Sequence, residues 1–503
     1  MNLLVVSPIL IPLTAAALGL MLWRWRRLQR LAGGIGAVAG FAAAVVLVAT
    51  VWRERILVTE LANWPAPYGI VLVADLLSSL LVLVSAGMGL LVTVYSFAST
   101  DKRREAFGYY PLFQVLIMGI NGAFLTGDLF NLYVWFEVML MASFVLLALG
   151  GERPQLEGAI KYVTLNLIAS AIFLAAVGLT YGVAGTLNLA DLGDKLAETD
   201  NPGLVTTLGV LYLIAFGVKA AVFPLFFWLP SSYHTPPVAV SAIFAALLTK
   251  VGVYSMVRVF TVLFLHEPEY TYHTLILTIG VLSMITGVLG AAVQSEFRRI
   301  LAFHSISQIG YMVMGLGLFT PLALAGAIIY IVHHSVVKAN LFLISGLVHR
   351  RQGSHELKKI GGVYLACPAL GLLFLVTAMS LAGIPPFSGF FAKLALVQAG
   401  LEAEAYIAVA AALAVGLMTL YSMTKIWTQV FWEPAPEGVT DGAAFPDDPS
   451  AGPWGMVIPV AILAAMAVAL GLGAEFMFRY AMAAAEQLLA PAEYIGAVLG
   501  RPS

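Results

Sequence analysis

Long apolar segments recur along the whole chain and are separated by short polar turns. Crossing the ~30 Å hydrocarbon core of a bilayer takes about 20 apolar residues in a helix, and windows of about that length find about fourteen segments. Their approximate bounds are 3–23, 31–51, 70–97, 109–127, 129–149, 158–184, 204–229, 238–265, 273–294, 299–319, 322–348, 367–397, 404–432 and 455–478. The pattern predicts an all-α polytopic membrane protein with about fourteen transmembrane helices. Residues 1–503 form a single transmembrane domain, because no polar stretch is long enough to bury a core of its own.

The composition supports this class and excludes others. Apolar residues make up 61% of the chain and charged residues 11%, against about 45–50% and about 25% in soluble domains, so a water-soluble enzyme is excluded. The 26 Lys and Arg residues balance 27 Asp and Glu residues, which argues against nucleic acid as a partner, since that needs a clustered basic surface. The one cysteine, Cys367, cannot form an intrachain disulfide or a multi-cysteine metal or cluster site.

Basic residues between the segments predict how the chain sits in the membrane. A positive cluster at 24–30 follows the first segment, whereas a secretory signal carries its charges first, so we expect 3–23 to be a retained helix. Fourteen Lys and Arg residues fall in the loops on one side and five on the other. The richer side is the cytoplasmic one, which places both termini outside.

Five ionisable residues lie deep inside the apolar segments; they are Glu137, Lys219, Lys250, Lys338 and Lys393. Each charge near a helix centre costs about 2.5–3.5 kcal/mol on the insertion scale, and a simple membrane anchor has no use for them. A static buried ion pair that fixes helix packing is the alternative, but one carboxylate cannot pair with four lysines. We therefore interpret the set as functional.

The remaining polar residues of the segments also admit structural explanations. Three basic residues lie within about two turns of a helix end and can snorkel to the interface; they are Lys161, Arg258 and Lys425. Asp75 and Asp128 are near helix ends too, where they cap a helix or face the interface. His334 lies four residues before Lys338, on the same helix face, and is either a packing residue or a partner of the lysine.

Prolines interrupt two of the segments close to these lysines. Pro224 follows Lys219, and Pro385 and Pro386 precede Lys393. Proline removes a backbone donor and clashes with the preceding turn, and in a membrane the freed carbonyls need other partners. Ordinary proline kinks are common in membrane helices, but paired broken helices in a transporter mark its transport site. The nearby lysines favour broken seventh and twelfth helices at a functional site.

Buried lysines are suited to proton transfer. Burial favours the neutral amine, so such a lysine can alternate between ammonium and amine. A row of these groups with water between them passes protons sideways through the membrane. Glu137 can hold Lys219 charged while the carboxylate is ionised and close, and weakening that pair would expel the proton of the lysine. The two residues together predict a coupling switch.

Several stretches around these residues resemble the antiporter-like subunits shared by Mrp-type cation/proton antiporters and respiratory complex I. They are FGVKAAVFP at 216–224, WLP at 228–230, HTPPVAVS at 234–241, LTKVGVY at 248–254, FHSISQIGY at 303–311, HSVVKANLF at 334–342 and GIPPFSGFFAK at 383–393. The resemblance covers nearly the whole chain, and motifs of this length are specific.

The resemblance implies two inverted five-helix repeats with broken helices 7 and 12. Residues 1–108 would hold helices 1–3, residues 109–265 helices 4–8 of the first repeat, residues 273–432 helices 9–13 of the second, and residues 455–478 helix 14. It also implies a proton relay through Glu137, Lys219, Lys250 and Lys393, with His334 and Lys338 bridging the two halves.

Partners and location are implied in the same way. Such subunits work in hetero-oligomers, here with the large A-type subunit and the small membrane subunits of an Mrp-type antiporter, in the inner membrane of a bacterial cell. The transported ions would be protons and Na⁺. This subunit type binds no redox cofactor, and the sequence does not locate a metal site for Na⁺.

Three functions remain open on the sequence. In the first, proton influx through this chain drives Na⁺ export by an assembled antiporter. In the second, the chain is a proton-pumping module of a NADH-quinone oxidoreductase or a membrane-bound hydrogenase. In the third it is a non-transporting assembly scaffold, which predicts that neutralising the buried lysines changes assembly alone.

Overall fold

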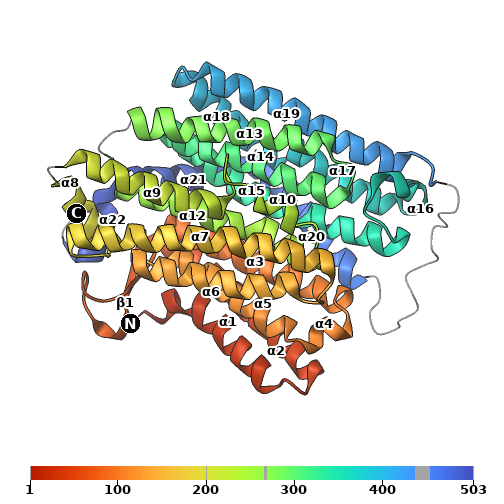
Figure 1. The fold of residues 1–503 in the computed structure, drawn as a ribbon, viewed down its shortest axis with the longest axis horizontal. Helices are drawn as coiled ribbons and strands as arrows, with labels where there is room; N and C mark the ends of the chain where they lie inside the picture. Colours follow the sequence, from red (N-terminus) through yellow and green to blue (C-terminus); the bar gives the residue numbers. More distant parts are fainter. Residues whose placement is uncertain (1, 200, 266–268, 437–453, 502–503) are drawn as a thin grey trace.

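The structure is a computed structural model that describes residues 2–199, 201–265, 269–436 and 454–501. Figure 1 shows a bundle of helices that run roughly along one axis. In the part described, twelve helices are long and apolar enough to cross a membrane, and two shorter apolar helices accompany them. Each of them overlaps one of the predicted segments, so the all-α polytopic class is confirmed. The number of fourteen crossings stays a prediction.

The first third of the chain forms the lower part of the bundle in Figure 1. Its helices are α1 (Leu3–Met21), α2 (Arg26–Glu54), α3 (Leu76–Ser99), α4 (Lys102–Ala106), α5 (Tyr109–Leu125), α6 (Leu129–Ala148) and α7 (Arg153–Ala184). Strands β1 (Leu57–Glu60) and β2 (Val71–Ala74) pair antiparallel between α2 and α3. The Asp75 side chain accepts from the backbone N–H of Ser78 at the start of α3, and Asp128 accepts from that of Asn131 at the start of α6. The capping role expected of both aspartates is confirmed.

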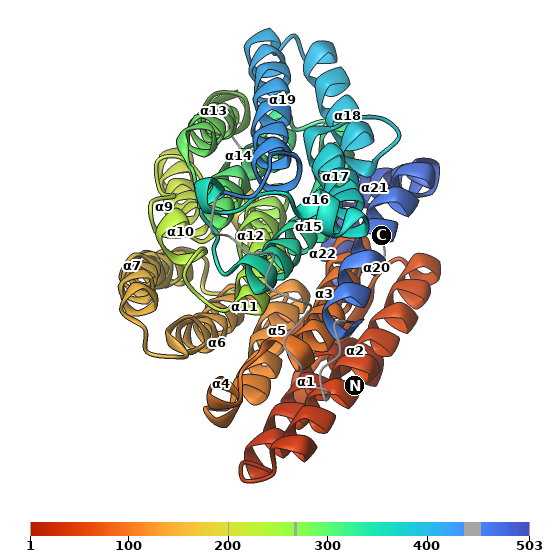
Figure 2. The same cartoon turned by 90° about the vertical axis from the view of Figure 1, so that its right-hand side faces the viewer.

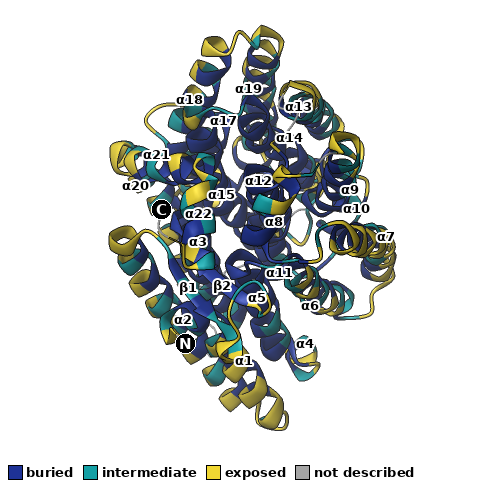
Figure 3. Cartoon of the chain, turned by 90° about the vertical axis from the view of Figure 1, so that its left-hand side faces the viewer, coloured by how far each residue is buried: buried dark blue, intermediate teal, exposed yellow. Residues whose placement is uncertain are grey.

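The middle of the chain supplies the centre of the bundle. Its elements are α8 (Leu189–Ala197), α9 (Pro202–Ala220), α10 (Trp228–Ser232), α11 (Val238–Ile243), the π-helix η2 (Phe244–Leu248), α12 (Thr249–Val262), the π-helix η3 (Glu269–Ile276), α13 (Leu277–Val293), α14 (Phe297–Leu318) and α15 (Pro321–Gln352). Helices α12, α14 and α15 are buried almost all round, together with the polar residues that they carry. Figure 3 shows them surrounded by outer helices, such as α1, α7 and α19, whose outward residues are exposed.

The last part of the chain packs on the other side of α15. Its helices are α16 (Val363–Ala366), α17 (Pro368–Ala382), α18 (Ser388–Glu402), α19 (Tyr406–Ile426) with the π-helix η5 (Trp427–Trp432), α20 (Trp454–Leu472), α21 (Ala474–Leu489) and α22 (Pro491–Leu499). Figure 2 shows α17 to α19 above α15 in that view, and α5 and α6 below it. The long α15 therefore lies between the two halves.

Both chain ends lie at one end of the bundle, here named the terminal face (Figure 1). The opposite end, named the basic face, carries the turn between α1 and α2 together with α4, where Arg30 pairs with Glu105. Arg104, Arg298 and Arg350 also gather there around one cavity. The expectation that the richer set of basic loops lies opposite the termini is confirmed; which face is cytoplasmic stays a prediction.

Both predicted helix breaks are present. Helix α9 ends at Ala220, and Pro224 lies in the non-helical turn before α10. Helix α17 ends at Ala382, and Pro385 and Pro386 lie between it and α18. The peptide bonds preceding Pro224 and Pro386 are cis. Lys219 is thus at the last turn of one half-helix and Lys393 in the second turn of another.

Several predicted boundaries were wrong. Residues 71–74 of the third segment form strand β2 rather than helix, because their backbone pairs with β1. The fourteenth segment does not stop at 478: α20 ends at Leu472, Gly473 turns the chain, and α21 continues to Leu489. The search for long apolar segments did not predict helix α21, because this helix is amphipathic. It buries its apolar side against the core through residues such as Tyr480, whose hydroxyl donates to the carbonyl of Leu76 at 2.9 Å.

A glycine sets how closely the two lysine-bearing helices of the first half approach. A Cβ on Gly252 of α12 would lie 2.5 Å from the backbone nitrogen of Ala220 and 2.9 Å from the carbonyl carbon of Lys219. Both atoms belong to the α9 backbone and cannot move aside. The contact joins the helix that carries Lys250 to the end of the helix that carries Lys219.

We expect Gly252→Ala to destabilise the protein by about 1–3 kcal/mol, because overpacking a tight helix contact costs that much. The measurement is the thermal unfolding midpoint of the purified protein in detergent. Gly182→Ala on α7 is the control, since a Cβ there meets nothing within 4 Å. Equal midpoints for the two variants would contradict the contact.

Candidate functional site

The first cluster of the site joins α6, α7 and α9. Ser170 of α7 lies between Glu137 and Lys219: its hydroxyl donates to the Glu137 carboxylate, and the Lys219 Nζ donates to the Ser170 Oγ at 3.1 Å. The Lys219 Nζ also donates to the carbonyl of Asn166 at 3.3 Å and lies 5.4 Å from the ring centre of Phe136. Lys219 is 5% exposed. The expected pairing of Glu137 with Lys219 is therefore indirect, through one hydroxyl.

Lys250 lies at the start of α12, directly after the π-helix η2. Its Nζ donates to the carbonyl of Ala245 in η2, and the residue is 1% exposed. A π-turn widens the helix, and such turns are frequent at functional sites. The lysine thus has a neutral backbone dipole rather than a carboxylate as its partner.

Helix α15 carries His334 and Lys338 through the middle of the protein. The Lys338 Nζ donates to the carbonyl of Leu301 on α14 at 2.7 Å. Both ring nitrogens of His334 are buried without a hydrogen-bond partner in the structure. His334 lies within electrostatic range of both Lys250 and Lys338. His334 and Lys338 therefore lie on the buried central helix of the bundle; their expected role as a bridge between two repeats stays a prediction.

Lys393 of α18 lies against the end of α17. Its Nζ donates to the carbonyls of Leu381 and Ala382 at 3.2 and 2.9 Å, which are the last carbonyls of α17 and carry the negative end of its dipole. It also lies 5.1 Å from the ring centre of Tyr311. The break at Pro385 and Pro386 thus frees the carbonyls that hold the amine.

Two further histidines belong to the same region, and the sequence reasoning did not single them out. His304 on α14 is fully buried with both ring nitrogens unpartnered, within electrostatic range of Lys338 and Lys393. The His333 Nδ1 lies 2.8 Å from the Ser388 Oγ on α18, one turn before Lys393. The sequence does contain a pattern that indicates these two histidines. His304 directly precedes Ser305, and His333 directly precedes His334, within two of the polar motifs.

Aromatic and amide groups connect these residues further. The Tyr330 hydroxyl donates to the Gln308 side chain, and the rings of Tyr330 and Tyr311 stack with centres 5.1 Å apart. The Tyr330 ring also lies beside His333 and His334, with ring centres 5.6 and 6.4 Å away. Aromatic and polar side chains therefore lie side by side from His334 through Tyr330 and Tyr311 to Lys393.

Arg258 does not snorkel, contrary to the sequence expectation. It is 4% exposed, and its guanidinium donates to the Asp75 carboxylate on α3. The other two end residues behave differently. Lys161 pairs with Glu157 at the surface, and Lys425 donates to the carbonyls of Ala292 and Gln294.

A polar cavity opens at the basic face, lined among others by Arg104, Glu152, Arg298, Arg350 and His355. Burial, together with the nearby charge of Arg298, lowers the pKa of His355 to about 2. This histidine is therefore neutral at ordinary pH, and the positive charge of the cavity comes from its arginines.

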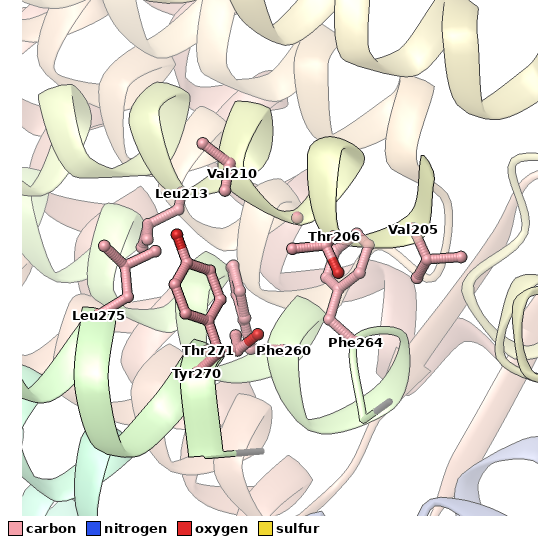
Figure 4. A pocket seen from close by; sticks show the side chains of 10 residues that line it. Val205, Thr206, Val210, Leu213, Phe260, Phe264, Tyr270, Thr271 and Leu275 are labelled. Atoms are coloured by element: carbon pink, nitrogen blue, oxygen red, sulfur yellow. The ribbon is translucent and has the colours of Figure 1, made fainter. Parts of the chain in front are cut away.

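Neither the apolar cleft nor a metal site adds to this set of buried ionisable residues. Figure 4 shows a cleft between α9, α12 and η3, lined mainly by apolar side chains such as Val210, Phe260 and Leu275, and none of the expected functional residues lines it. Over the described ranges, no group of three or more His, Cys, Asp and Glu side chains could hold a metal ion.

The geometry defines a class: a polytopic membrane protein with a buried row of ionisable groups between two broken helices. Residues 126–419 match the family model described as NADH:quinone oxidoreductase/Mrp antiporter, transmembrane. The D-type subunit of the Na(+)/H(+) antiporter of Alkalihalophilus pseudofirmus is 46% identical over 99% of this chain and 100% of its own length. The D-type subunit of the Bacillus subtilis Na(+)/H(+) antiporter is 42% identical over the same shares.

Comparison with solved structures gives the same family. A chain of the Mrp complex from Dietzia sp. has a TM-score of 0.91 at 34% identity, covering 99% of this chain and 100% of its own. A chain of respiratory complex I from Thermus thermophilus has a TM-score of 0.80 at 25% identity, covering 97% and 100%. The chain belongs to the NADH:quinone oxidoreductase/Mrp antiporter family, as a D-type subunit of the Mrp branch. It is thus a component of a multisubunit antiporter and not an enzyme.

Ser170→Ala removes the hydroxyl that joins Glu137 to Lys219. Hydrogen bonds to charged groups contribute about 1.5–3 kcal/mol, so we expect cation/proton antiport in membrane vesicles to fall about tenfold or more. Ser143→Ala is the control, because Ser143 is a buried serine of α6 that bonds to the Tyr162 hydroxyl instead. Unchanged antiport in Ser170→Ala would show that the bridge does not matter.

Proposed function

We propose that this chain moves protons for a Na⁺/H⁺ antiporter along a relay of Glu137, Lys219, Lys250, His334, Lys338 and Lys393. The observation that carries the proposal is the row itself: in the described chain, none of the four relay lysines forms an ion pair with a carboxylate. A charge held by a strong counter-ion stays fixed, whereas an amine held by neutral groups can release its proton. The names of the relatives support Na⁺ as the exchanged ion.

The first step of the relay takes place at Glu137. When its carboxylate is ionised, the Ser170 hydroxyl points to it and offers its own oxygen to the Lys219 ammonium. When Glu137 takes up a proton, that support weakens and Lys219 favours the neutral amine. The proton of Lys219 then passes toward Lys250, whose helix touches the Lys219 backbone at Gly252.

The central and last steps of the relay use histidines and lysines that have no carboxylate partner in the described chain. His334 has two unpartnered nitrogens between Lys250 and Lys338, so it can accept a proton on one nitrogen and release it from the other. From Lys338 the row continues past His304 and the His333–Ser388 contact to Lys393. His304 and His333 therefore join the proposed relay.

The remaining features follow the resemblance and the relatives. We place the first repeat at residues 109–265 and the second, in inverted orientation, at residues 273–432, with residues 1–108 and residues 455–478 outside the repeats. The basic face is cytoplasmic and both termini are outside, in the inner membrane of a bacterial cell. The partners are the large A-type subunit and the small membrane subunits of the same antiporter.

The two alternatives receive less support. A proton-pumping module of a NADH-quinone oxidoreductase or membrane-bound hydrogenase would share the fold, but the Na(+)/H(+) antiporter relatives match at higher identity than the complex I chain. A scaffold has no need for a fully buried histidine in the same region as two buried lysines, since burying such groups costs free energy.

We expect Lys219→Ala to reduce antiport to background while the complex still assembles, because the relay loses its first amine. Glu137→Gln keeps the volume, removes the ionisable group and should impair transport too. The measurement is the Na⁺-dependent collapse of a proton gradient in vesicles at matched complex levels. Lys161→Ala, in the exposed pair with Glu157, is the control. Near-normal exchange in Lys219→Ala would exclude a relay through this amine.

We expect Lys393→Arg to assemble and to lose most transport. Arginine keeps the positive charge and the donors to the α17 carbonyls but cannot give up its proton in a protein. Lys425→Arg is the matched control: Lys425 also donates to two carbonyls at a helix end and lies outside the relay. Antiport of both variants is compared at equal complex levels. A fully active Lys393→Arg would make Lys393 a fixed charge rather than a proton carrier.

A further inference from the structure

A stripe of polar residues runs from Lys250 along α12 toward the terminal face. Lys250, Tyr254 and Arg258 are spaced by four residues, so they lie on one side of the helix. Each step rises about 6 Å along the helix axis. All three are buried, at 1%, 2% and 4% exposed. The stripe is a polar path from the relay toward the aqueous face that carries the chain ends.

Arg258 closes the end of this stripe. Its Nη2 donates to the Asp75 carboxylate, its Nε donates to the Tyr254 hydroxyl at 3.4 Å, and its guanidinium carbon lies 5.1 Å from the ring centre of Tyr494 on α22. The Tyr254 hydroxyl in turn donates to the carbonyl of Phe124 at 2.7 Å. Helices α12 and α22 and the start of α3 therefore meet at the guanidinium, and α5 joins them through the Tyr254 hydroxyl.

The pair is unlike every other ion pair of the described chain, because both of its side chains are at least 95% buried. The two charges of the pair also occupy different positions relative to the stripe. The carboxylate lies at the start of α3, where its other oxygen accepts from the Ser78 backbone, while the cation lies on the stripe itself. A proton that left Lys250 along the stripe would meet a permanent positive charge, since arginine does not deprotonate in proteins.

We propose that Arg258 is an electrostatic barrier that prevents protons on Lys250 from leaving directly to the terminal face. Fixed arginines exclude protons and cations from other membrane pores by the same repulsion. Asp75 holds the barrier in place and offsets the cost of burying it. Protons at Lys250 are then kept within the relay, whose next member is His334. The inference rests on the proposed relay and adds a residue that prevents protons from leaking out of it.

The test compares two substitutions within the pair in vesicles that contain the assembled antiporter. Arg258→Met keeps a long side chain and removes the charge. Asp75→Asn removes the opposite charge but keeps the helix cap, because asparagine caps as well as aspartate. The readout is the decay of an imposed proton gradient with no Na⁺ present, divided by the amount of assembled complex.

A barrier predicts an asymmetry between the two variants. Arg258→Met should leak protons at least threefold faster than the unmodified complex, and Asp75→Asn should not leak, since its arginine keeps the charge. Equal leak rates in the two variants, fast or slow, would overturn the proposal. The pair would then be a static ion pair that fixes helix packing. Arg258→Gln, which keeps a donor for Asp75, provides the same comparison if the methionine variant accumulates poorly.

A double substitution tests the route. Lys250→Ala combined with Arg258→Met should return the leak to the unmodified rate, because protons then lack the amine from which they enter the stripe. A double variant that still leaks would contradict a path through Lys250. Failure of the relay itself is distinguishable, since it is measured as Na⁺-dependent exchange in Lys219→Ala and not as leak.

Discussion

The structure depends on how four lysines are kept inside an apolar bundle that offers them almost no counter-charge. Backbone carbonyls hold them: Lys338 bonds to Leu301, and Lys393 to the end of α17. Lys250 bonds within the π-turn of its own helix, and Lys219 bonds to Asn166 and to the Ser170 hydroxyl. For Lys250 and Lys393, a π-turn and a broken helix supply carbonyls that a regular helix would use itself. Lys338 and Lys219 bond instead to carbonyls within the regular helices α14 and α7. Neutral backbone dipoles, from irregular and regular segments alike, are therefore the common partners of these buried amines.

Arg258 shows the opposite solution at a short distance. It is buried to a similar degree as Lys219, yet it has a carboxylate at Asp75, a hydroxyl and two aromatic rings around it. A charge satisfied so completely stays where it is, whereas an amine on neutral dipoles is poised between two protonation states. In the proposed relay, the chemistry of the partners thus separates a permanent cation, Arg258, from lysines that can exchange protons.

Much of this could be predicted from the sequence, because the strongest signals were local. Apolar segment length gave the helices, and the prolines next to Lys219 and Lys393 gave the two breaks. What failed depended on distant partners. Arg258 reads as a snorkelling residue until Asp75, 183 positions away, is known to face it. Helix α21 is too amphipathic to register as a membrane segment, and Ser170 is an ordinary helix serine until two other helices bring Glu137 and Lys219 to it.

The position of the one mid-span carboxylate gives the row a direction. In the described part of the chain, Glu137 is linked to Lys219 through Ser170, while Lys393, at the far end, contacts two carbonyls and the Tyr311 ring. Protonation of Glu137 therefore changes the energy of a proton at one end and leaves the other end unaffected. In the proposed relay, with Arg258 as a barrier toward the terminal face, that local change favours movement of charge along α12 and α15 toward α18. The asymmetric arrangement of neutral and charged partners is what would give the proposed path its direction.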